Sequence, residues 1–324
     1  MTTRRALLAG IGTVALSAGL AGAYGLGAFR EATRQTRRRL ATRASLIPSS
    51  VGPLEYAVVG DGPPFMMIHG TGGGFDQGLL FGEATRRRGF SIVAPSRFGY
   101  LGSAFPDDAS PTHQADVLVE LLDHLQIDRL AVAGGSAGAL TAAEFGLRHP
   151  DRCSHLVLLV PAMNLSGRDP VEFTAFQRRL VGAVLGSDAV FWALSALAPG
   201  QMLGTLLATD PALLDGVGAE ERLRAETILA ELMPVSRKGD GLRMDGFWAG
   251  TPCQTAVERI TVPTLILSCE DDRFGTAATA RTLHDRIPDA RLVVYPDGGH
   301  IWLGHDEDVA DEIAAFLAKA KREG

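Results

Sequence analysis

One serine in the sequence lies in a setting that favours nucleophilic chemistry. Ser136 is the centre of Gly134-Gly135-Ser136-Ala137-Gly138, a G-x-S-x-G pattern that follows an apolar run and precedes a helix-like segment. Small neighbours let the chain turn sharply between a strand and a helix, so that the hydroxyl points outward. The start of the helix then offers N–H groups to developing negative charge. The pattern predicts that Ser136 is a nucleophile.

A serine hydroxyl needs a base that removes its proton, and the base needs a carboxylate that orients it. His300, in YPDGGHIW, follows the last strand-like run on a Gly-Gly turn and is the best placed of the eight histidines. The segment after TLILS offers Glu270, Asp271 and Asp272 as the carboxylate, whereas Asp297 is disfavoured because it lies so close to His300 along the chain. The residues alone leave the choice of carboxylate open.

A glycine-rich loop follows another apolar run. It spans His69 to Gly78, and four of the five residues from Gly70 to Gly74 are glycine. Such a backbone turns freely and can present N–H groups, as an oxyanion hole requires. We expect the donors to be the backbone N–H of Ala137 and that of Thr71 or Gly72. The loop lacks the Gly-Lys-Ser/Thr ending of a phosphate-binding loop, so it predicts no nucleotide cofactor.

The elements that would position these residues alternate between short apolar runs and stretches of helical periodicity. Seven runs have the composition of strands, and several are apolar without interruption, which is typical of strands covered on both faces. The alternation predicts a largely parallel sheet with crossover helices. The seven runs begin at Leu54, Phe65, Phe90, Arg129, His155, Thr264 and Arg291. Ser110 and Pro111 mark the start of one intervening helix, as an N-cap and a first helical residue.

The alternation stops between about residues 162 and 250, where helical periodicity continues with no strand between. We expect a helical insertion over the sheet there. Arg237 and Lys238, in PVSRKGDG, are expected in a solvated loop, with the steering of an acidic substrate as the alternative. The apolar side chains of the insertion either line an apolar pocket or pack the insertion on the sheet; they include Phe173, Phe176, Phe191, Trp192, Leu203, Leu206 and Leu207.

The motifs HGTGGG, GGSAG, EDD and GGH, in this order, resemble the α/β-hydrolase fold family from about Val51 to the end of the chain. PSRFGYLGS, from Pro95 to Ser103, resembles that family's loop after the fourth strand. The resemblance implies an α/β, doubly wound, mostly parallel eight-stranded sheet with a helical cap after the sixth strand. It also implies a role for each candidate residue: Ser136 as nucleophile, Asp272 as acid, His300 as base, and Thr71 with Ala137 as oxyanion donors.

The function implied is that of a serine hydrolase acting on a small or medium acyl ester, with an apolar small-molecule substrate. Because Ser136 stands where haloalkane dehalogenases and epoxide hydrolases need a carboxylate, both of those branches are disfavoured. C–C bond hydrolysis or cofactor-free perhydrolysis on the same triad remains an alternative. A ligand-binding module that is tethered to a membrane and has lost catalysis is the alternative from another class. No cofactor and no metal ion are implied.

Composition restricts the remaining possibilities. The 324 residues are 46% hydrophobic and 21% charged, which is typical of a globular protein. A net charge of -6 argues against a general nucleic-acid binder. Three widely spaced cysteines predict neither a disulfide framework nor a zinc site. The first 45 residues differ from the rest, because they contain eight arginines and one glutamate.

This basic leader also contains an apolar segment. Ala6 to Phe29 carries no charge, and at about 1.5 Å per helical residue it is long enough to cross a hydrocarbon core of about 30 Å. TRRALLAG resembles a twin-arginine export signal and Ala21-Gly22-Ala23 fits a cleavage site, but arginines after the segment favour retention on the cytoplasmic side. We expect residues 1–45 to be a signal or anchor segment that holds the protein at a membrane, with export as the alternative, and residues 46–324 to be the hydrolase domain.

Overall fold

A computed structural model describes residues 25–165 and 182–319 of the chain. The chain divides into two units, Met1–Thr42 and Arg43–Gly324. Residues 25–43 are helical, and most of the apolar segment expected over residues 6–29 lies outside the described residues.

Among the described helices, no single one is both long and apolar enough to cross a membrane. One pair, Asp188–Leu197 with Pro199–Leu206, meets those criteria together but is bent by 114°.

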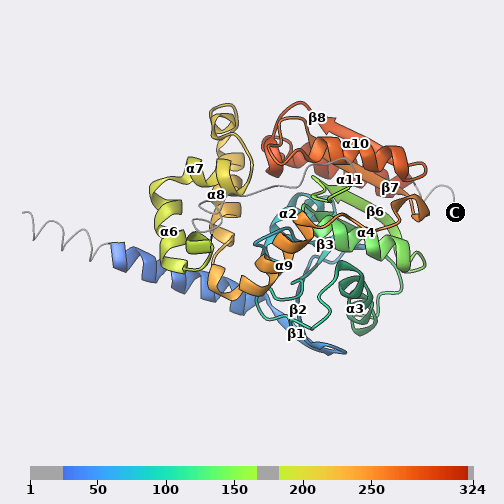
Figure 1. Ribbon diagram of the computed structural model, residues 1–324, viewed down its shortest axis with the longest axis horizontal. Helices are drawn as coiled ribbons and strands as arrows, with labels where there is room; N and C mark the ends of the chain where they lie inside the picture. The colour runs from blue at the N-terminus through green and yellow to red at the C-terminus, as the bar shows by residue number, and fades with distance from the viewer. Residues whose placement is uncertain (1–24, 166–181, 320–324) are drawn as a thin grey trace, which may run out of the picture. The chain divides into compact units, whose positions relative to one another are not determined.

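The second unit is built on an eight-stranded sheet with the strand order β1-β2-β4-β3-β5-β6-β7-β8 (Figure 1). β2 pairs in antiparallel fashion with β1 and β4, and every other neighbouring pair is parallel. The predicted doubly wound, mostly parallel sheet is therefore confirmed. Its strands are β1 (Ser45–Ser49), β2 (Gly52–Val59), β3 (Pro64–Ile68), β4 (Ser91–Pro95), β5 (Leu130–Gly135), β6 (Cys153–Leu159), β7 (Thr264–Cys269) and β8 (Arg291–Tyr295).

The seven predicted runs correspond to β2 through β8, and the sequence analysis did not recognise β1. β1 has five residues, SLIPS, of which only Ile47 is buried. It pairs with β2 alone and forms an edge of the sheet, where Pro48 is tolerated although it has no N–H to donate. A short edge strand of this composition has no apolar run and no alternation by which to be recognised.

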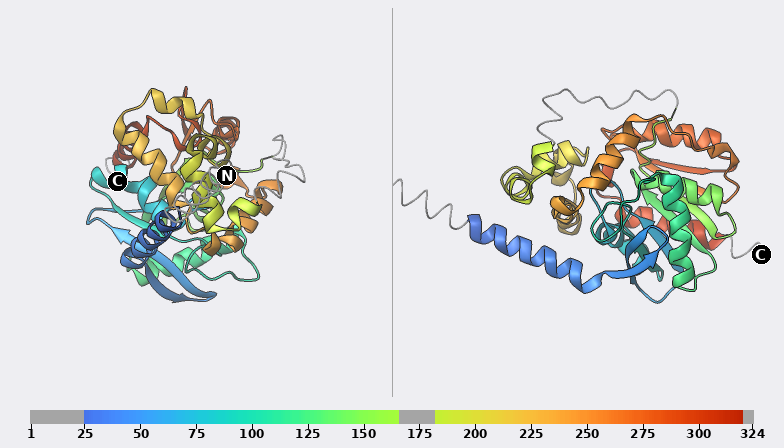
Figure 2. Two further views of the ribbon diagram at one scale, coloured as in Figure 1. Left: turned by 90° about the vertical axis from the view of Figure 1, so that its left-hand side faces the viewer. Right: turned by 60° about the horizontal axis from the view of Figure 1, so that its bottom comes forward.

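Helices cover both faces of the sheet (Figure 2). The chain moves in one direction along the sheet from β3 to β4 and in the other from β5 to β6, so right-handed crossovers place the connecting helices on opposite faces. On one face α2 (Phe75–Arg87) packs against α11 (Asp306–Lys319). On the other face α3 (Pro111–His124) packs against α4 (Gly138–Arg148), and α10 (Thr276–Arg286) covers β7 and β8. As predicted, Ser110 caps α3: its Oγ accepts from the His113 N–H at 3.1 Å.

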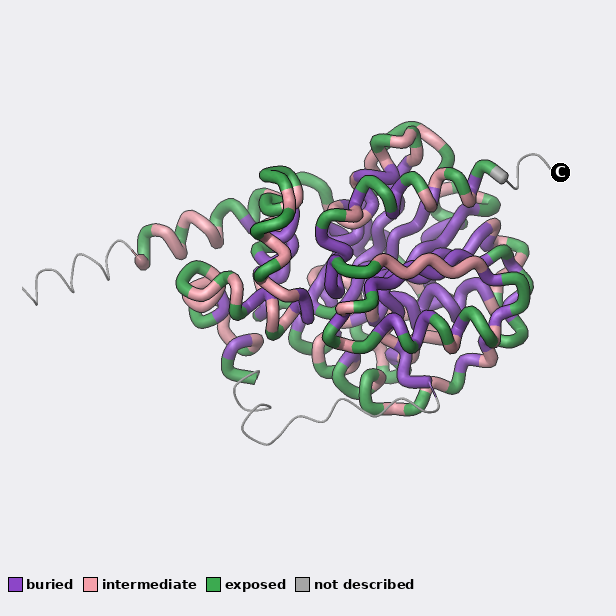
Figure 3. The backbone as a smooth tube through the Cα atoms, turned by 90° about the horizontal axis from the view of Figure 1, so that it is seen from above, coloured by how far each residue is buried: buried purple, intermediate pink, exposed green. Residues whose placement is uncertain are grey.

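The core lies between these layers, and the buried segments in Figure 3 gather in the interior, with exposed segments outside them. All six residues of β5 are buried. Cys153 and Cys269 are buried free thiols, and Cys253 is half-buried and also free. Burial raises the pKa of the Cys153 thiol to about 12. These cysteines behave as small core residues.

A helical cap separates β6 from β7, as expected, and its described residues, 160–165 and 182–263, contain no strand. Figure 1 shows α6, α7 and α8 grouped beside the sheet. The main cap helices are α6 (Asp188–Leu197), α7 (Pro199–Leu206), α8 (Ala219–Glu231) and α9 (Gly239–Gly250), with short 3₁₀ turns η1 (Pro211–Asp215), η2 (Val235–Arg237) and η3 (Val257–Arg259).

The apolar side chains that the sequence analysis singled out in the cap differ in burial. Phe191, Leu203 and Leu207 are buried, while Trp192 and Leu206 are half-buried. Phe173 and Phe176 lie outside the described residues. Packing of the cap therefore accounts for the three buried side chains.

Candidate active site

The carboxyl ends of the parallel strands bring the predicted triad together. Ser136 follows β5, Asp272 follows β7 and His300 follows β8, at the edge where open α/β sheets bind ligands. His300 Nε2 lies 2.7 Å from Ser136 Oγ. On the other side of the ring, His300 Nδ1 lies 2.8 Å from Asp272 Oδ2. Both distances are those of hydrogen bonds, so the three side chains form a continuous chain from hydroxyl to carboxylate.

The turn at Ser136 is strained and depends on glycine on both sides. Ser136 has a φ of +53°, in the left-handed region that side chains with a Cβ rarely adopt. A methyl group at Gly134 would lie 2.4 Å from the Gly138 carbonyl oxygen, and one at Gly138 would lie 2.5 Å from the His69 carbonyl oxygen. The glycines therefore let β5, α4 and the loop after β3 approach one another closely, with the hydroxyl at the turn.

The Asp272 carboxylate is buried, with 4% of the residue exposed, and is fully hydrogen-bonded. Oδ2 accepts from the Thr276 hydroxyl as well as from His300, and Oδ1 accepts from the Phe274 N–H at 2.9 Å. Burial by itself would raise the pKa of Asp272, but the His300 ring and the donors from Thr276 and Phe274 hold it below the usual carboxyl value. The group is therefore ionised at neutral pH and can accept the Nδ1 proton of the ring.

The other carboxylates considered for this place have different partners. Asp271 Oδ1 accepts from the backbone N–H of Gly299 at 2.8 Å, so Asp271 holds the loop that carries His300 without facing the ring. Glu270 pairs with Arg281 at the surface, and Asp297 Oδ1 lies 2.9 Å from His305 Nε2. Of the four, the structure places only Asp272 against His300.

The glycine-rich loop lies directly beside the serine. A methyl group at Gly70 would come within 3.1 Å of Ser136 Cβ. The N–H of Gly70 donates to Gln77 Oε1 at 2.9 Å, and that of Gly72 donates to the Tyr100 hydroxyl at 3.2 Å. Among the described residues the Thr71 N–H has no acceptor.

Thr71 is therefore better suited than Gly72 to donate to an oxyanion, since the Gly72 N–H is already engaged. The second expected donor, Ala137, lies at the start of α4. The first N–H groups of a helix have no partner within the helix, and they carry its positive dipole end. The structure thus brings two backbone donors to the side of Ser136, from the loop after β3 and from α4.

A buried polar cluster behind this loop was missed in the sequence analysis. Arg97 follows β4, and its Nη1 and Nη2 donate to the two carboxylate oxygens of Asp245 on α9, each at 2.7 Å. Arg97 Nη2 also donates to the Gly70 carbonyl at 3.1 Å, and the Tyr100 hydroxyl donates to Asp245 Oδ2. Burial and the Asp245 carboxylate raise the pKa of Tyr100 well above its usual value, so that it keeps this proton.

His69 joins the same cluster as a neutral ring. Its Nε2 accepts from the backbone N–H of Arg97 at 2.9 Å, so the proton is on Nδ1, which donates to the Gly70 carbonyl at 2.7 Å. Burial, followed by the neighbouring Arg97 cation, holds the pKa of His69 well below the usual histidine value. The ring fixes the start of the glycine-rich loop and remains uncharged.

The prediction of a solvated loop at Lys238 is wrong. We expected Arg237 and Lys238 in a solvated loop, and Arg237 is exposed, but Lys238 is 0% exposed. The backbone at Lys238 turns inward between η2 and α9, and its ammonium donates to the carbonyls of Gly72 and Glu231 at 2.7 and 2.8 Å. Local polarity predicted a surface loop because the sequence does not show that a backbone carbonyl of the glycine-rich loop lies beneath this residue.

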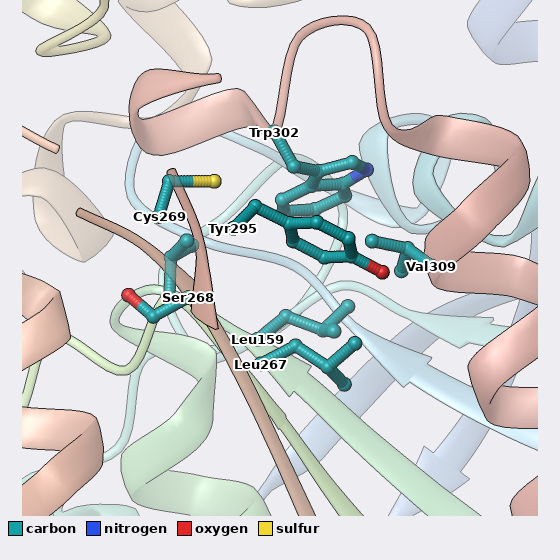
Figure 4. Close-up of a pocket in the computed structure, with 8 residues that line it drawn as sticks. Leu159, Leu267, Ser268, Cys269, Tyr295, Trp302 and Val309 are labelled. Carbon is teal, nitrogen blue, oxygen red and sulfur yellow. The ribbon is translucent and has the colours of Figure 1, made fainter. Parts of the chain in front are cut away.

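A small apolar pocket is drawn in Figure 4. Its lining comes from β6 and the residue after it, from β7, β8 and α11, and from Trp302; it consists of Leu159, Val160, Leu267, Ser268, Cys269, Tyr295, Trp302 and Val309. None of the three triad side chains lines it, so we assign it to the packing of the core. Among residues 25–165 and 182–319, no group of His, Cys, Asp and Glu is arranged to hold a metal ion.

Comparison with known proteins agrees with this architecture. Residues 65–314 match a family model described as the alpha/beta hydrolase family. The chain is 29% identical over 277 residues to 2-hydroxymuconate semialdehyde hydrolase from Pseudomonas sp. (strain CF600), across 81% of this chain and 89% of that protein. It is 27% identical over 264 residues to pimeloyl-[acyl-carrier protein] methyl ester esterase from Chromobacterium violaceum, across 80% of this chain and 96% of that protein.

A solved structure shows the same fold. The alpha/beta hydrolase fold protein from Nakamurella multipartita superposes with a TM-score of 0.67 at 23% identity, covering 85% of this chain and 98% of that chain. The family match extends over most of the sequence, from β3 into α11. A match of that extent, on a sheet with this strand order, makes the chain a hydrolase of the alpha/beta hydrolase family.

Proposed function

We propose that the protein is a serine hydrolase that cleaves a small or medium acyl ester through an acyl-enzyme. The observation that carries this proposal is the hydrogen-bonded chain from Ser136 through His300 to Asp272, with distances of 2.7 and 2.8 Å. His300 Nε2 takes the proton of Ser136 Oγ as the oxygen attacks the ester carbonyl carbon. Asp272 accepts from Nδ1 and stabilises the imidazolium that forms.

The attack places negative charge on the former carbonyl oxygen. The backbone N–H groups of Thr71 and Ala137 stabilise that oxyanion, and such donors are most effective when they are fixed before the reaction begins. When the tetrahedral intermediate collapses, the bond to the alkoxy oxygen breaks and His300 gives its proton to the departing alcohol. Water then attacks the acyl-enzyme by the same route and releases the acid.

C–C bond hydrolysis is the second candidate. It is favoured by the similarity to 2-hydroxymuconate semialdehyde hydrolase, which extends over 89% of that protein. The similarity to a methyl ester esterase extends over 96% of that protein and favours ester hydrolysis. Both reactions begin at a carbonyl group, so the triad serves either one. The substrate must therefore be identified by turnover measurements.

The test of the chemistry is labelling of the full-length protein with a fluorophosphonate, followed by intact mass. We expect one adduct per chain, absent from Ser136→Ala and retained by Ser236→Ala, which changes an exposed serine of the cap. Substantial ester turnover by Ser136→Ala would refute the assignment. A folded wild-type chain that takes no label and turns over no substrate would favour the non-catalytic ligand-binding alternative.

The test of the substrate class compares p-nitrophenyl butyrate with 2-hydroxymuconate semialdehyde, each over a range of concentrations from below KM to saturation. Ester hydrolysis as the main activity requires the higher kcat/KM for the ester. A kcat/KM that is at least about 100-fold higher for the semialdehyde, or about 2.7 kcal/mol in transition-state stabilisation, would make C–C hydrolysis the function.

We also propose that residues 1–45 tether the hydrolase to a membrane. The support is the uncharged stretch from Ala6 to Phe29, long enough to cross a bilayer, and the arginines that follow it. The full chain should remain with the membrane fraction after a carbonate wash and keep its intact mass. A soluble product that begins after Ala23 would show cleavage and export instead.

A further inference from the structure

The backbone N–H and the carbonyl of Gly72, which belong to the peptide groups on either side of its Cα, are held by side chains that are distant in sequence. Its N–H donates to the Tyr100 hydroxyl at 3.2 Å, and its carbonyl oxygen accepts from Lys238 Nζ at 2.7 Å. Tyr100 belongs to the loop after β4, whereas Lys238 belongs to the cap. Gly72 directly follows Thr71, the residue whose N–H we assign to the oxyanion hole. The two side chains therefore fix the backbone that immediately follows that N–H.

Both side chains are themselves fixed. The Tyr100 hydroxyl donates its proton to Asp245, which leaves its oxygen to accept from Gly72. Asp245 is held by two hydrogen bonds from Arg97. Lys238 donates a second hydrogen bond, to the carbonyl of Glu231 at the end of α8, at 2.8 Å. A shift of the Gly72 backbone would therefore break or lengthen several buried hydrogen bonds at once.

The burial of Lys238 calls for an explanation. Lysine is almost never fully buried unless it is paired, because removing an ammonium group from water costs several kcal/mol. An apolar side chain of similar length would fill the same volume without that cost. What such a side chain cannot do is donate to the carbonyls of Gly72 and Glu231, and the first of these belongs to the glycine-rich loop.

We propose that Lys238 is a positioning residue of the oxyanion hole, which acts with Tyr100 to fix the backbone at Gly72 so that the Thr71 N–H faces the developing oxyanion. This inference rests on the proposed serine-hydrolase function. It makes the cap a part of the catalytic apparatus, since the cap supplies the cation that holds the loop. A lysine that bound substrate would act on KM, whereas a lysine that orients a transition-state donor acts on kcat.

The test compares Lys238→Met, Lys238→Gln and Arg237→Met in the full-length protein. Methionine keeps most of the length and removes the donor, glutamine restores a neutral N–H donor, and Arg237→Met changes the exposed neighbour in the same way. The probes are p-nitrophenyl butyrate turnover and the rate of fluorophosphonate labelling. We expect Lys238→Met to lower kcat by about 10- to 100-fold, because a misplaced donor costs up to about 100-fold and the complete loss of an oxyanion donor costs about 10²- to 10³-fold.

The expected pattern has three further parts. The KM of Lys238→Met changes by no more than about threefold, because its effect falls on the transition state. The labelling rate falls together with kcat, since the phosphonate oxygen uses the same donors, and Lys238→Gln recovers part of both. Arg237→Met matches the wild type. A folded Lys238→Met with wild-type kcat and labelling rate would overturn the proposal, as would a rise in KM with unchanged kcat.

Tyr100→Phe keeps the proposal testable if Lys238→Met does not fold. It preserves the ring and removes the acceptor for the Gly72 N–H, so we expect the same loss in kcat. Full activity of this variant would overturn the proposal. If both single variants fold, the double variant should lose less than the product of the two losses, because both side chains hold the backbone of one residue. A folded wild-type chain that takes no label and turns over no substrate would instead refute the proposed function itself.

Discussion

The Thr209 hydroxyl of the cap accepts a hydrogen bond from the backbone N–H of His300, with 3.0 Å between Oγ1 and N. Thr209 gives its own proton to the Leu207 carbonyl at 2.7 Å. On the other side of His300, Arg224 of α8 donates from Nη1 and Nη2 to the Ile301 carbonyl, each at 3.0 Å. The cap thus holds the backbone of the histidine from both directions, in addition to its contact with the glycine-rich loop.

Thr209→Val tests the first of these contacts. Valine has nearly the same shape as threonine, but it leaves the buried His300 N–H without an acceptor, and an unsatisfied buried donor costs about 1–3 kcal/mol. We expect the free energy of unfolding, measured in urea, to fall by that amount and kcat to fall with it. Thr205→Val on the exposed side of α7 is the matched control and should change stability by less than about 0.5 kcal/mol. Equal stability of the two variants would show that the Thr209 contact contributes nothing.

The two neighbouring aspartates should differ sharply in their effect on catalysis. Asp272→Asn keeps the shape of the side chain but favours the wrong tautomer of His300, and the comparable change in a serine protease triad lowers kcat by about 10⁴-fold. Asp271→Asn still offers an oxygen to the Gly299 N–H, so we expect a loss of less than about tenfold, for an orienting contact outside the triad. The measurement is kcat for p-nitrophenyl butyrate with both purified variants.

The prediction is that Asp272→Asn loses more activity than Asp271→Asn. A larger loss for Asp271→Asn would mean that the loop rearranges in solution and that the other carboxylate serves His300. Thermal unfolding of both variants provides the control, because a variant that has lost its fold loses activity for a different reason.

Glycine is required at Gly138 and dispensable at Gly246. In Gly138→Ala the new methyl would lie 2.5 Å from the His69 carbonyl oxygen and 2.6 Å from that of Ile68, both backbone atoms that cannot move aside cheaply. We expect this variant to lose labelling at Ser136 and at least about 2 kcal/mol of stability, as overpacking does. At Gly246, on the exposed side of α9, a methyl meets nothing within 4 Å. Gly246→Ala should gain up to about 1 kcal/mol from helix propensity, and urea denaturation of both variants decides the matter.

The sequence alone predicts the strand ends and the residues that they carry, because each depends on local pattern. An apolar run followed by Gly-Gly-Ser or Gly-Gly-His specifies both the strand and the turn. Local pattern does not distinguish Asp271 from Asp272. The two residues are adjacent in one turn, and a shift of the turn by one residue would exchange the directions of their side chains. The structure distinguishes them by their partners, Gly299 for one and the His300 ring for the other.

The residues that sequence reasoning missed act through contacts between distant segments. Gly72 is excluded as a free donor by Tyr100, 28 positions away, and Lys238 is buried by a contact with Gly72 that spans 166 positions. Asp245 lies on α9, whose sequence GDGLRMDGFWAG contains four glycines and has weak helix propensity. No periodicity within such a segment indicates a helix, and no local motif indicates its partner.

The stability of the protein should decrease in mild acid because of His69. The buried ring is held neutral in the folded state, with a pKa well below the usual value, because of burial and the cations Arg97 and Lys238. In the unfolded chain the same ring gains a proton below about pH 6.5, so the unfolded state binds more protons in this range. The free energy of unfolding then falls as the pH drops from about 6.5 toward the folded pKa, by up to about 1.4 kcal/mol per pH unit from this one group.

His69→Gln isolates this contribution, because glutamine can accept from the Arg97 N–H and does not titrate. Urea unfolding at pH 7.5, 6.0 and 5.0 should show a steeper loss of stability for the wild type than for His69→Gln, by about 1 kcal/mol per pH unit below pH 6.5. Above that pH the two curves should run parallel, since neither state exchanges a proton at this site. His124→Gln, at an exposed position, is the control and should follow the slope of the wild type. Parallel curves for His69→Gln and the wild type over the whole range would mean that the folded protein admits a proton at His69, and the loop from Gly70 to Gly74 would then lose its neutral anchor in acid.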